Sequence, residues 1–548
     1  MTACADLITA GDRLFGKREN LLSFWQDVAE NFAPDIADFT SRQTLGDDYA
    51  SKLVTSYPII TARELADQFG AMLRPSVKDA AVMWVEGLED HEGKAWLEWA
   101  TRIMRRAMYD RSAQYVIAAK DGERDFSLFG QAVLTCEPAP DKSHLLFRSW
   151  HLRDTAWSND LTGAVECVHR KWETPTAKDL ARIFGESKLH PKVQDCLRPG
   201  KDPYTEIKCR HAVIPADTYH GEHKYRTPLV SVYIDVDNEH IIEQTGQRSS
   251  PYIIPRWQRI KGTQYATSPA VTCALPEARL LQSMTYTLLE AGEKFVNPPL
   301  LQTQDAIRSD VDVRAGGITM VSADYDERTG EVLRPLKQDK SGMPLGLELQ
   351  QRSEEMLRKA FYADKLSMPQ RGGPQETAYE VGQRVQQYIR DALPLVEPVE
   401  IEFNGGVWER GFAVALAEGA FGPPDSIPES LRGADIEFKF ASPLREQVDR
   451  EKGRIFIEGV QLIQAGAALD PAVANIPDAV VTVRDVLQGI GWETKWLRSP
   501  KAVEAAADMQ AEQAKAQQML DAMTQAGGID KDLGQASPDI SGKMGMGA

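Results

Sequence analysis

Cysteine and histidine side chains are concentrated between residues 167 and 223. They are Cys167, His169, His190, Cys196, Cys209, His211, His220 and His223. Thiolate and imidazole are ligands that zinc prefers, and four of them make a tetrahedral site. The spacing fits such a site poorly, because Cys167/His169 and Cys209/His211 are i, i+2 pairs in alternating segments, so each pair points to one face of a strand. We therefore expect buried thiols and ordinary histidines, with no metal site and no cofactor.

Short catalytic motifs are missing from the sequence. It contains no G-x-x-x-x-G-K-[ST] phosphate loop, no G-x-G-x-x-G opening a helix after a strand, no H-E-x-x-H and no G-x-S-x-G. These absences argue against an ATP-driven motor and against a hydrolase. We expect no catalytic residues and no enzymatic activity. A zinc-dependent hydrolase built on the cysteines and histidines is the alternative from the class of enzymes.

Two cations, Lys365 and Arg371, lie in the loop DKLSMPQRGGP, between two segments with strong helix patterns. A flexible Gly/Pro loop can present cations to a polyanion, although loop lysines and arginines are usually only solvated. In a ring-shaped oligomer each residue would be repeated as a circle of positive charge. The sequence alone does not show such a ring. The hypothesis that this loop lies close to DNA therefore depends on oligomerisation.

Two further groups lie on one expected helix. Trp96 and Trp99 have helical spacing, which favours packing in a core or between subunits over a stacking platform for bases. The basic face formed by Arg102, Arg105 and Arg106 is interpreted as a solvated or ion-paired surface, with contact to an acidic neighbour as the alternative.

Composition sets the class of protein. The chain has 548 residues, enough for more than one core, and 42% apolar with 26% charged residues is typical of globular proteins. The 63 Lys+Arg against 80 Asp+Glu give a net charge of −17, so contact with nucleic acid must be local or non-adhesive. No apolar run reaches the length of a membrane span, and the N-terminus lacks a signal-like core. Six scattered cysteines without a C-x-x-C pair indicate free thiols in a reducing cytosol.

The N-terminal half combines helices with a sheet region. Apolar spacing predicts a helix over 6–33 that stops at Pro34, and a third helix over 93–110. The motif TARE predicts a capping box at Thr61 for a second helix that ends near Arg74. Alternation over 126–257 predicts strands, interrupted by one helix with its N-cap at Thr176, Asp179 in the capping box and Gly185 at its end.

The C-terminal half is mainly helical. Ser268-Pro269 predicts the start of a long helix that ends at Asn297, with a possible kink at Pro276. Short strands, ITMVSA and EVLRPL, follow, and then a second long helix over about 346–363. A capping box at Thr377 begins the next helix, which continues through Trp408 to Glu418. The strand ADIEFKF follows. Two further helices then begin at Ser442-Pro443 and at Ser499-Pro500. From Gly527 onward the chain has too little apolar content to fold alone.

Several of these segments, in this order, resemble the head-to-tail connector, or portal, proteins of short-tailed bacteriophages. The segments are IIPRWQRIKGTQYATSPAVTCALPEARLLQ at 253–282, PQETAYEVGQR at 374–384, FASPLREQVDREK at 440–452 and GWETKWLRSPKAVEA at 491–505. The N-terminal third is similar through WQDVAENFAP, TARELADQFGAMLRPS and DFSLFGQAVLTCEP. The resemblance covers roughly residues 6–520, and the Cys/His stretch is not part of the pattern.

The resemblance implies an α+β, mainly α portal fold, assembled as a ring that is usually of twelve copies. It implies a wing at 1–267, stem helices at 268–296 and 346–363, a clip at 297–345 and a tunnel loop at 364–375, which would hold Lys365 and Arg371 nearest the DNA. The wing would return at 376–441, a helical crown would occupy 442–526, and 527–548 would be a flexible tail.

The same resemblance implies the setting of the protein. The ring would lie at one capsid vertex of the virion, after assembly in the cytoplasm of the bacterial host, and would conduct double-stranded DNA without sequence specificity during packaging and ejection. Its partners would be other copies of itself, the major capsid and scaffolding proteins, the terminase packaging motor and tail adaptor or tail proteins, with no membrane. Another structural virion component, such as a tail adaptor or an internal head protein, is the alternative function.

Overall fold

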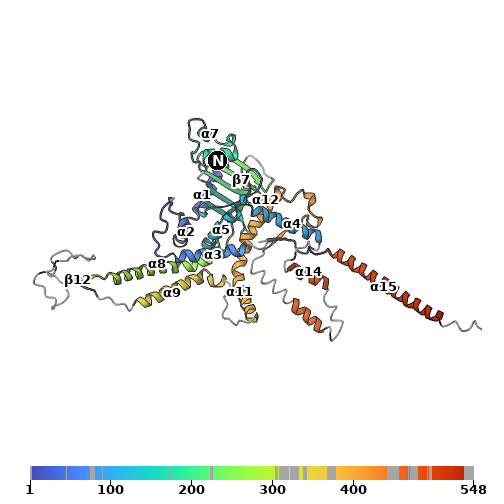
Figure 1. The fold of residues 1–548 in the computed structure, drawn as a ribbon. Coiled ribbons are helices and arrows are strands. Elements are labelled where there is room, and N and C mark those ends of the chain that lie inside the picture. The colour runs from blue at the N-terminus through green and yellow to red at the C-terminus, as the bar shows by residue number, and fades with distance from the viewer. Residues whose placement is uncertain are drawn as a thin grey trace, which may run out of the picture. The chain divides into compact units, whose positions relative to one another are not determined.

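The computed structural model describes residues 3–535 except 45, 75–80, 89, 173–174, 222–225, 303–306, 308–310, 312–319, 321, 323–332, 337–341, 367–377, 441–455, 467, 469–478, 490–491 and 493–495. The chain forms two compact units. The first contains Met1–Val82, Thr101–Gly422 and Phe438–Val448, and the second contains Met83–Ala100, Pro423–Glu437 and Asp449–Ala548. The expected α+β class, mainly α, is confirmed (Figure 1).

The N-terminal segment forms two helices where the sequence predicts one. These are α1 (Ala3–Gly16) and α2 (Glu19–Phe32), and the break falls at Lys17 and Arg18. The side chain of Arg18 is buried and donates to the backbone carbonyls of Leu152, Arg153 and Thr155. The break therefore coincides with a contact to a distant part of the chain.

The prediction that a capping box at Thr61 begins the second helix is wrong. Helix α3 (Tyr57–Leu73) begins four residues earlier, with Pro58 in its first turn, so Thr61 lies inside the helix and its hydroxyl donates to the Tyr57 carbonyl. Proline is favoured in a first helical turn because its missing N–H costs nothing there. The next helices are α4 (His91–Met108), which confirms the third expected helix, and α5 (Tyr115–Phe129).

A five-stranded antiparallel sheet lies in the first unit. Its strands run in chain order, β4 (Thr155–Asn159), β5 (Val165–Trp172), β6 (Cys209–Pro215), β7 (Leu229–Asp235) and β8 (His240–Gln247). Between β5 and β6 the chain forms α6 (Ala177–Phe184) and α7 (Pro191–Cys196). The capping box of Thr176 and Asp179 is confirmed, and Gly185 follows the last turn of α6.

Each face of this sheet has its own apolar cluster. On one face Cys4 and Leu7 of α1 join Val230, Val232 and Ile234. On the other, Leu180, Phe184 and Val193 of the α6–α7 insertion join Cys209 and Ile242. The sheet is therefore covered on both faces.

The residues that the structure describes also form four smaller sheets. The sheet β3 (Leu145–Ser149), β2 (Leu134–Pro138), β9 (Tyr252–Ile253) contacts α5 and α12. The strand pairs are β1 (Ala81–Trp84) with β14 (Glu437–Phe440), β10 (Gln258–Arg259) with β11 (Ala266–Thr267), and β12 (Leu300–Gln302) with β13 (Leu333–Pro335). Gly130 has φ +71°, and a Cβ at this position would lie 2.1 Å from the carbonyl carbon of Thr267, so glycine permits this close approach of two backbones.

Two long helices lie side by side in the first unit, as the sequence predicts (Figure 1). They are α8 (Pro269–Val296), whose first turn is capped by Ser268, and α9 (Gly342–Ala360), which begins four residues before its predicted start. Strand β12 was not predicted, β13 falls within the predicted strand EVLRPL, and most of ITMVSA lies outside the described residues.

After α9 the chain forms the short helix α10 (Ala363–Leu366) and then α11 (Ala378–Val399). A π-helical segment (Glu400–Gly405) joins α11 to α12 (Gly406–Ala417), so the helix predicted through Trp408 is confirmed with one change of winding. The capping box expected at Thr377 lies outside the described residues.

The C-terminal part of the second unit is helical. Its described helices cover residues 456–466, α14 (Ala479–Gly489) and α15 (Pro500–Gln535), and the hydroxyl of Ser499 accepts the Ala502 N–H as an N-cap. The start predicted at Ser442-Pro443 lies outside the described residues, and α15 continues past Gly527, where the sequence predicts loss of structure. Among the residues described from 456 to 519, none is buried. In the described part of the chain, moreover, no helix combines the length and the apolar character of a membrane span.

Candidate functional site

The two Cys/His pairs point to opposite faces of the five-stranded sheet. Cys167 packs on the α1 face, together with His169, which lies close to Gly11 of α1. Cys209 packs on the other face, where His211 stacks on Tyr233 at 4.1 Å. In an antiparallel pair, directly opposed residues share a face, and His211 opposes Arg170 rather than His169. The two pairs cannot supply one tetrahedral metal site.

The two buried histidines, His169 and His211, lie in environments that keep them uncharged. His211 hydrogen-bonds Tyr252 Oη at 2.6 Å and Ser231 Oγ at 2.7 Å, and burial, together with the Arg170 charge, lowers its pKa well below the usual value. Burial next to Arg210 lowers the pKa of His169 to about 4. Both side chains are therefore neutral at pH 7.

The remaining members of the set do not converge with them. His190 accepts the Lys192 N–H at the start of α7, the Cys196 thiol donates to the Lys192 carbonyl, and His220 is exposed. His223 lies outside the described residues. Across the described ranges, no three His, Cys, Asp or Glu side chains are grouped as metal ligands, and all six cysteines are free thiols.

The other residue groups singled out in the sequence lie on α4. The rings of Trp96 and Trp99 are 6.1 Å apart, and Trp99 is 37% exposed. Of the three arginines, Arg102 and Arg106 are exposed, while the Arg105 guanidinium lies 6.0 Å from the centre of the Tyr109 ring. The two tryptophans therefore contact each other, and the basic face is partly packed against an aromatic ring.

The helix pair α8–α9 is the most distinctive surface of the first unit. The buried residues of α8 all precede Gln282, so none of its last fifteen residues, Gln282–Val296, is buried, and in α9 only Ser353 and Leu357 are buried. Eight large apolar side chains of the pair are at least 44% exposed: Leu280, Tyr286, Leu289, Val296, Leu345, Leu347, Leu349 and Met356. A two-helix hairpin that buries so little of its own surface needs further contacts to be stable.

The base of the helix pair is attached to the N-terminal helices. Gln282 Oε1 accepts the N–H groups of Val54 and Thr55, its Nε2 donates to the Thr55 carbonyl, and Tyr57 Oη contacts the Glu354 carbonyl. These bonds fix the loop before α3 onto α8 and α9. The helices are therefore held at Gln282 and Glu354, while their distal halves, residues 283–296 and 342–352, contain no buried residue.

Lys365 is placed by a sharp turn at the end of α9. Tyr362 has φ +57°, which ends the helix, and the neighbouring Phe361 and Leu366 are buried as anchors. Lys365 itself is exposed, with Nζ 5.8 Å from the centre of the Tyr362 ring. Arg371 lies outside the described residues. Of the two expected cations, the structure therefore describes Lys365 alone, and it places this side chain on the surface.

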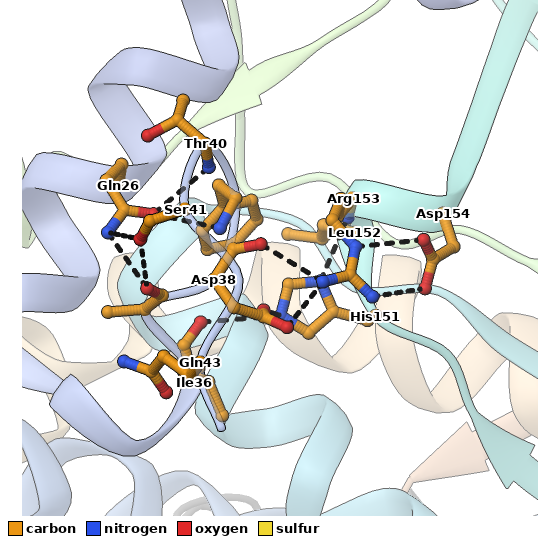
Figure 2. Close-up of polar contacts among 12 residues, drawn as sticks. Gln26, Ile36, Asp38, Thr40, Ser41, Gln43, His151, Leu152, Arg153 and Asp154 are labelled. Carbon is orange, nitrogen blue, oxygen red and sulfur yellow. Dashed lines mark hydrogen bonds and ion pairs between the residues drawn. The ribbon is translucent and has the colours of Figure 1, made fainter. Parts of the chain in front are cut away.

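Sequence reasoning missed a polar cluster that fixes the loop after α2 (Figure 2). The carboxylate of Asp38 lies 3.0 Å from His151 Nε2 and pairs with Arg153, which also bonds Asp154. Gln26 donates to the Ala37 carbonyl at 2.8 Å and accepts the N–H groups of Phe39 and Thr40. No local motif indicates this cluster, because Asp38 and Arg153 are far apart in sequence.

The electrostatics of this cluster are coupled. Burial alone would raise the pKa of Asp38, but hydrogen bonds and charges from His151 and Arg153 lower it. Burial alone would lower the pKa of His151, but the Asp38 hydrogen bond and the carboxylate of Asp125 raise it. Removal from water raises the pKa of Asp125 to about 7. These contacts hold the loop after α2 against His151 and Arg153.

The sequence profile of the family described as bacteriophage head to tail connecting protein matches residues 5–497. The chain belongs to this family. A relative described as a probable portal protein of Bordetella phage BPP-1 is 24% identical over 453 residues, covering 80% of this chain and 79% of the relative. The expected identity of the chain as a phage portal protein, or head-to-tail connector, is confirmed.

Two solved structures can be superposed on this connector over much of its length, but with low TM-scores. One is a chain from the virion of a native gene transfer agent particle, 11% identical, covering 76% of this chain and 86% of its own length, with a TM-score of 0.34. The other, from the neck of an empty gene transfer agent particle, is 12% identical and covers 75% and 91%, also with a TM-score of 0.34.

Proposed function

We propose that this connector closes into a ring of identical copies, usually twelve in the family, that conducts double-stranded DNA through one capsid vertex of the virion. The observation that carries the proposal is the exposed apolar surface of α8–α9. Large exposed apolar patches on soluble chains mark surfaces that are covered in the assembly. A head-to-tail interface whose rotation closes produces a ring and covers this surface on every copy.

Charge supports the role of a conduit. A channel must not bind the polymer that it conducts, and the net charge of −17 per copy disfavours the counterion-releasing contacts that hold proteins to DNA. Exposed Lys365, just after the turn at Tyr362, would present a local cation within this acidic background. In our assignment residues 364–375 form the tunnel loop, with Lys365 and Arg371 nearest the DNA.

The other parts receive their roles from the same assignment. Residues 268–296 and 346–363 form the stem, and 297–345 form the clip, which docks tail proteins or the terminase motor. Residues 1–267 and 376–441 form the wing, which faces the major capsid and scaffolding proteins. The crown, 442–526, lies inside the head. The ring assembles in the cytoplasm of the bacterial host.

A paired substitution on the helix pair tests the proposal. Leu289 and Leu347 are 56% and 52% exposed, so changing both to lysine removes apolar contacts between copies without opening a core. We expect light scattering to give the mass of a ring for the wild-type chain. The double variant Leu289→Lys, Leu347→Lys should lower the ring fraction at least about tenfold, because charge would be placed in each apolar interface.

The matched control is Ile183→Lys, which places the same charge at a 44% exposed apolar residue on α6, away from the helix pair. This variant should keep the wild-type mass. A ring mass that survives the paired substitution would contradict the assignment of α8–α9 as the ring interface.

A further inference from the structure

An apolar groove of about 330 Å³ lies in the second unit, between α14, residues 497–498 and the first turn of α15. We call it the α14 groove. It is lined by Val480, Val483, Arg484, Leu487, Leu497, Arg498 and Val503. Five of the seven residues are aliphatic and two are arginines, and Arg484 also bonds the Arg498 carbonyl. An apolar floor beside two guanidinium groups fits a helix that presents an apolar side chain flanked by carboxylates.

The adjoining segment is typical of a protein interface. Trp492 and Trp496 are 46% and 57% exposed, with rings packed edge to face at 5.9 Å. Tryptophan and arginine are the residues most enriched at the centres of protein interfaces. Their exposure next to the α14 groove indicates that a protein surface covers this part of the chain.

Helix α15 carries a face of matching chemistry, which we call the α15 face. It is formed by Ala505, Asp508, Met509, Glu512 and Ala516, which share one side of the helix at about 100° per residue. All five are exposed, and Met509 is 61% exposed. Two carboxylates thus flank one flexible apolar side chain, between alanines that allow close approach.

The α15 face cannot reach the groove of its own chain. Val503 is a wall of that groove, and at about 100° per residue it lies roughly 160° around α15 from Ala505 and roughly 120° from Met509. A straight helix cannot turn its far side back onto its own first turn. The groove and the face therefore point in opposite directions from one element, which is the arrangement that a head-to-tail contact between copies requires.

We propose that the α15 face of one copy docks in the α14 groove of the next copy, with Met509 on the aliphatic floor and Asp508 and Glu512 beside Arg484 and Arg498. This inference rests on the proposed ring and names a second contact surface within it. The occupant is another copy of this chain, because the chain itself supplies the complementary charges.

Charge exchange tests the pairing in the full chain. Arg484→Glu alone and Glu512→Arg alone should each lower the ring fraction roughly tenfold, because like charges would meet at every interface. The double variant should recover most of the wild-type ring fraction. Gln518→Arg, which adds the same cation to α15 away from the α15 face, is the matched control and should assemble as the wild type does. Circular dichroism checks that each variant retains its helix content.

Disulfide trapping gives a second readout that does not depend on the strength of assembly. Leu487→Cys combined with Met509→Cys should give a ladder of covalent multimers on oxidation of assembled rings. Each single substitution is the control for cross-links through the exposed Cys273. A wild-type chain that stays monomeric would refute the proposed ring itself. Three results would each overturn the docking proposal where the wild-type chain forms rings. They are an unchanged ring fraction in Arg484→Glu, no recovery of the ring fraction in the double variant, and no covalent ladder after oxidation of the double-cysteine rings.

Discussion

Arg18 is the buried cation that connects α1 and α2 to the sheet region. It is 2% exposed and donates to three backbone carbonyls around Leu152–Thr155, including that of Thr155 at 2.7 Å. Burial lowers its pKa to about 10, so it stays charged at pH 7. A planar guanidinium can serve several carbonyls at once, and lysine cannot reproduce that geometry.

We predict that Arg18→Ala lowers the free energy of unfolding by about 3 kcal/mol, because buried carbonyls would lose their donors. Arg18→Lys should recover only part of this loss. Denaturant unfolding measures both, and Arg13→Ala, an exposed arginine of α1, serves as the control with a change within about 0.5 kcal/mol. Equal effects of the two alanine variants would show that the Arg18 contacts contribute nothing.

Asp125 gives the stability of the first unit a pH dependence. Its pKa is raised from 3.8 to about 7, so the folded state binds its proton more tightly than the unfolded state. A raised pKa contributes stability below the unfolded value, and this contribution is lost as pH rises through about 7. The raised pKa of His151 acts in the same direction, because its charge is also favoured in the folded state.

We predict that Asp125→Asn reduces the loss of stability between pH 5 and pH 8 by on the order of 1–2 kcal/mol, since one pKa unit corresponds to about 1.4 kcal/mol and partial exposure screens the effect. Denaturant midpoints at the two pH values measure this difference. Asp217→Asn, at an exposed residue, should leave the pH dependence unchanged. A wild-type pH slope retained in Asp125→Asn would rule out Asp125 as its source.

At the scale of elements, Gln282 anchors the middle of α8, because its side-chain amide takes the place of a backbone pairing partner. Its amide bonds both N–H groups and one carbonyl of the segment Val54–Thr55. We predict that Gln282→Ala speeds amide hydrogen exchange at Val54 and Thr55 at least about tenfold, because each lost bond is worth on the order of 1 kcal/mol.

The control for Gln282 is Arg279→Ala, which removes an ion pair to Asp27 whose two side chains are 54% and 55% exposed. Exposed pairs contribute little, so exchange at Val54 and Thr55 should not change. Exchange that is the same in Gln282→Ala and the wild type would show that this glutamine does not hold the loop.

The sequence predicts those elements whose signals are local. The capping box at Thr176 and the start of α8 at Ser268 depend on side chains within a few residues of the backbone groups that they satisfy, and both are confirmed. The break after Gly16 was missed because the carbonyls that Arg18 binds lie more than a hundred residues away. The start of α3 was misplaced because Pro58 outweighs the capping box expected at Thr61.

The parts of the candidate site differ in how far the sequence predicts them. The two long helices around a β insertion could be read from caps and periodicity, and their exposed apolar faces became visible only when burial was known. The strand spacing predicts that each Cys/His pair points to one face of its strand, and only the sheet register shows that the two pairs lie on opposite faces, since His211 opposes Arg170. The cluster at Asp38 and His151 depends on tertiary contact and left no sequence signal.

At the scale of the whole molecule, two parts of the chain contain no buried residue among those that the structure describes. The distal half of α8 has no buried residue, and neither do the described residues from 456 to 519. These parts belong to different units, and each would be completed by contact with neighbouring copies. A ring explains both observations with one symmetry, because every copy then supplies the missing surface to the next.

Electron microscopy of the purified chain, with light-scattering mass on the same sample, tests this central claim most directly. The ring account predicts closed rings of about twelve copies with a central hole, as the family's usual ring implies, in moderate and in high salt, because apolar contacts on α8 and α9 survive the screening of charges. A chain that remains monomeric or dimeric across salt and concentration would contradict the account.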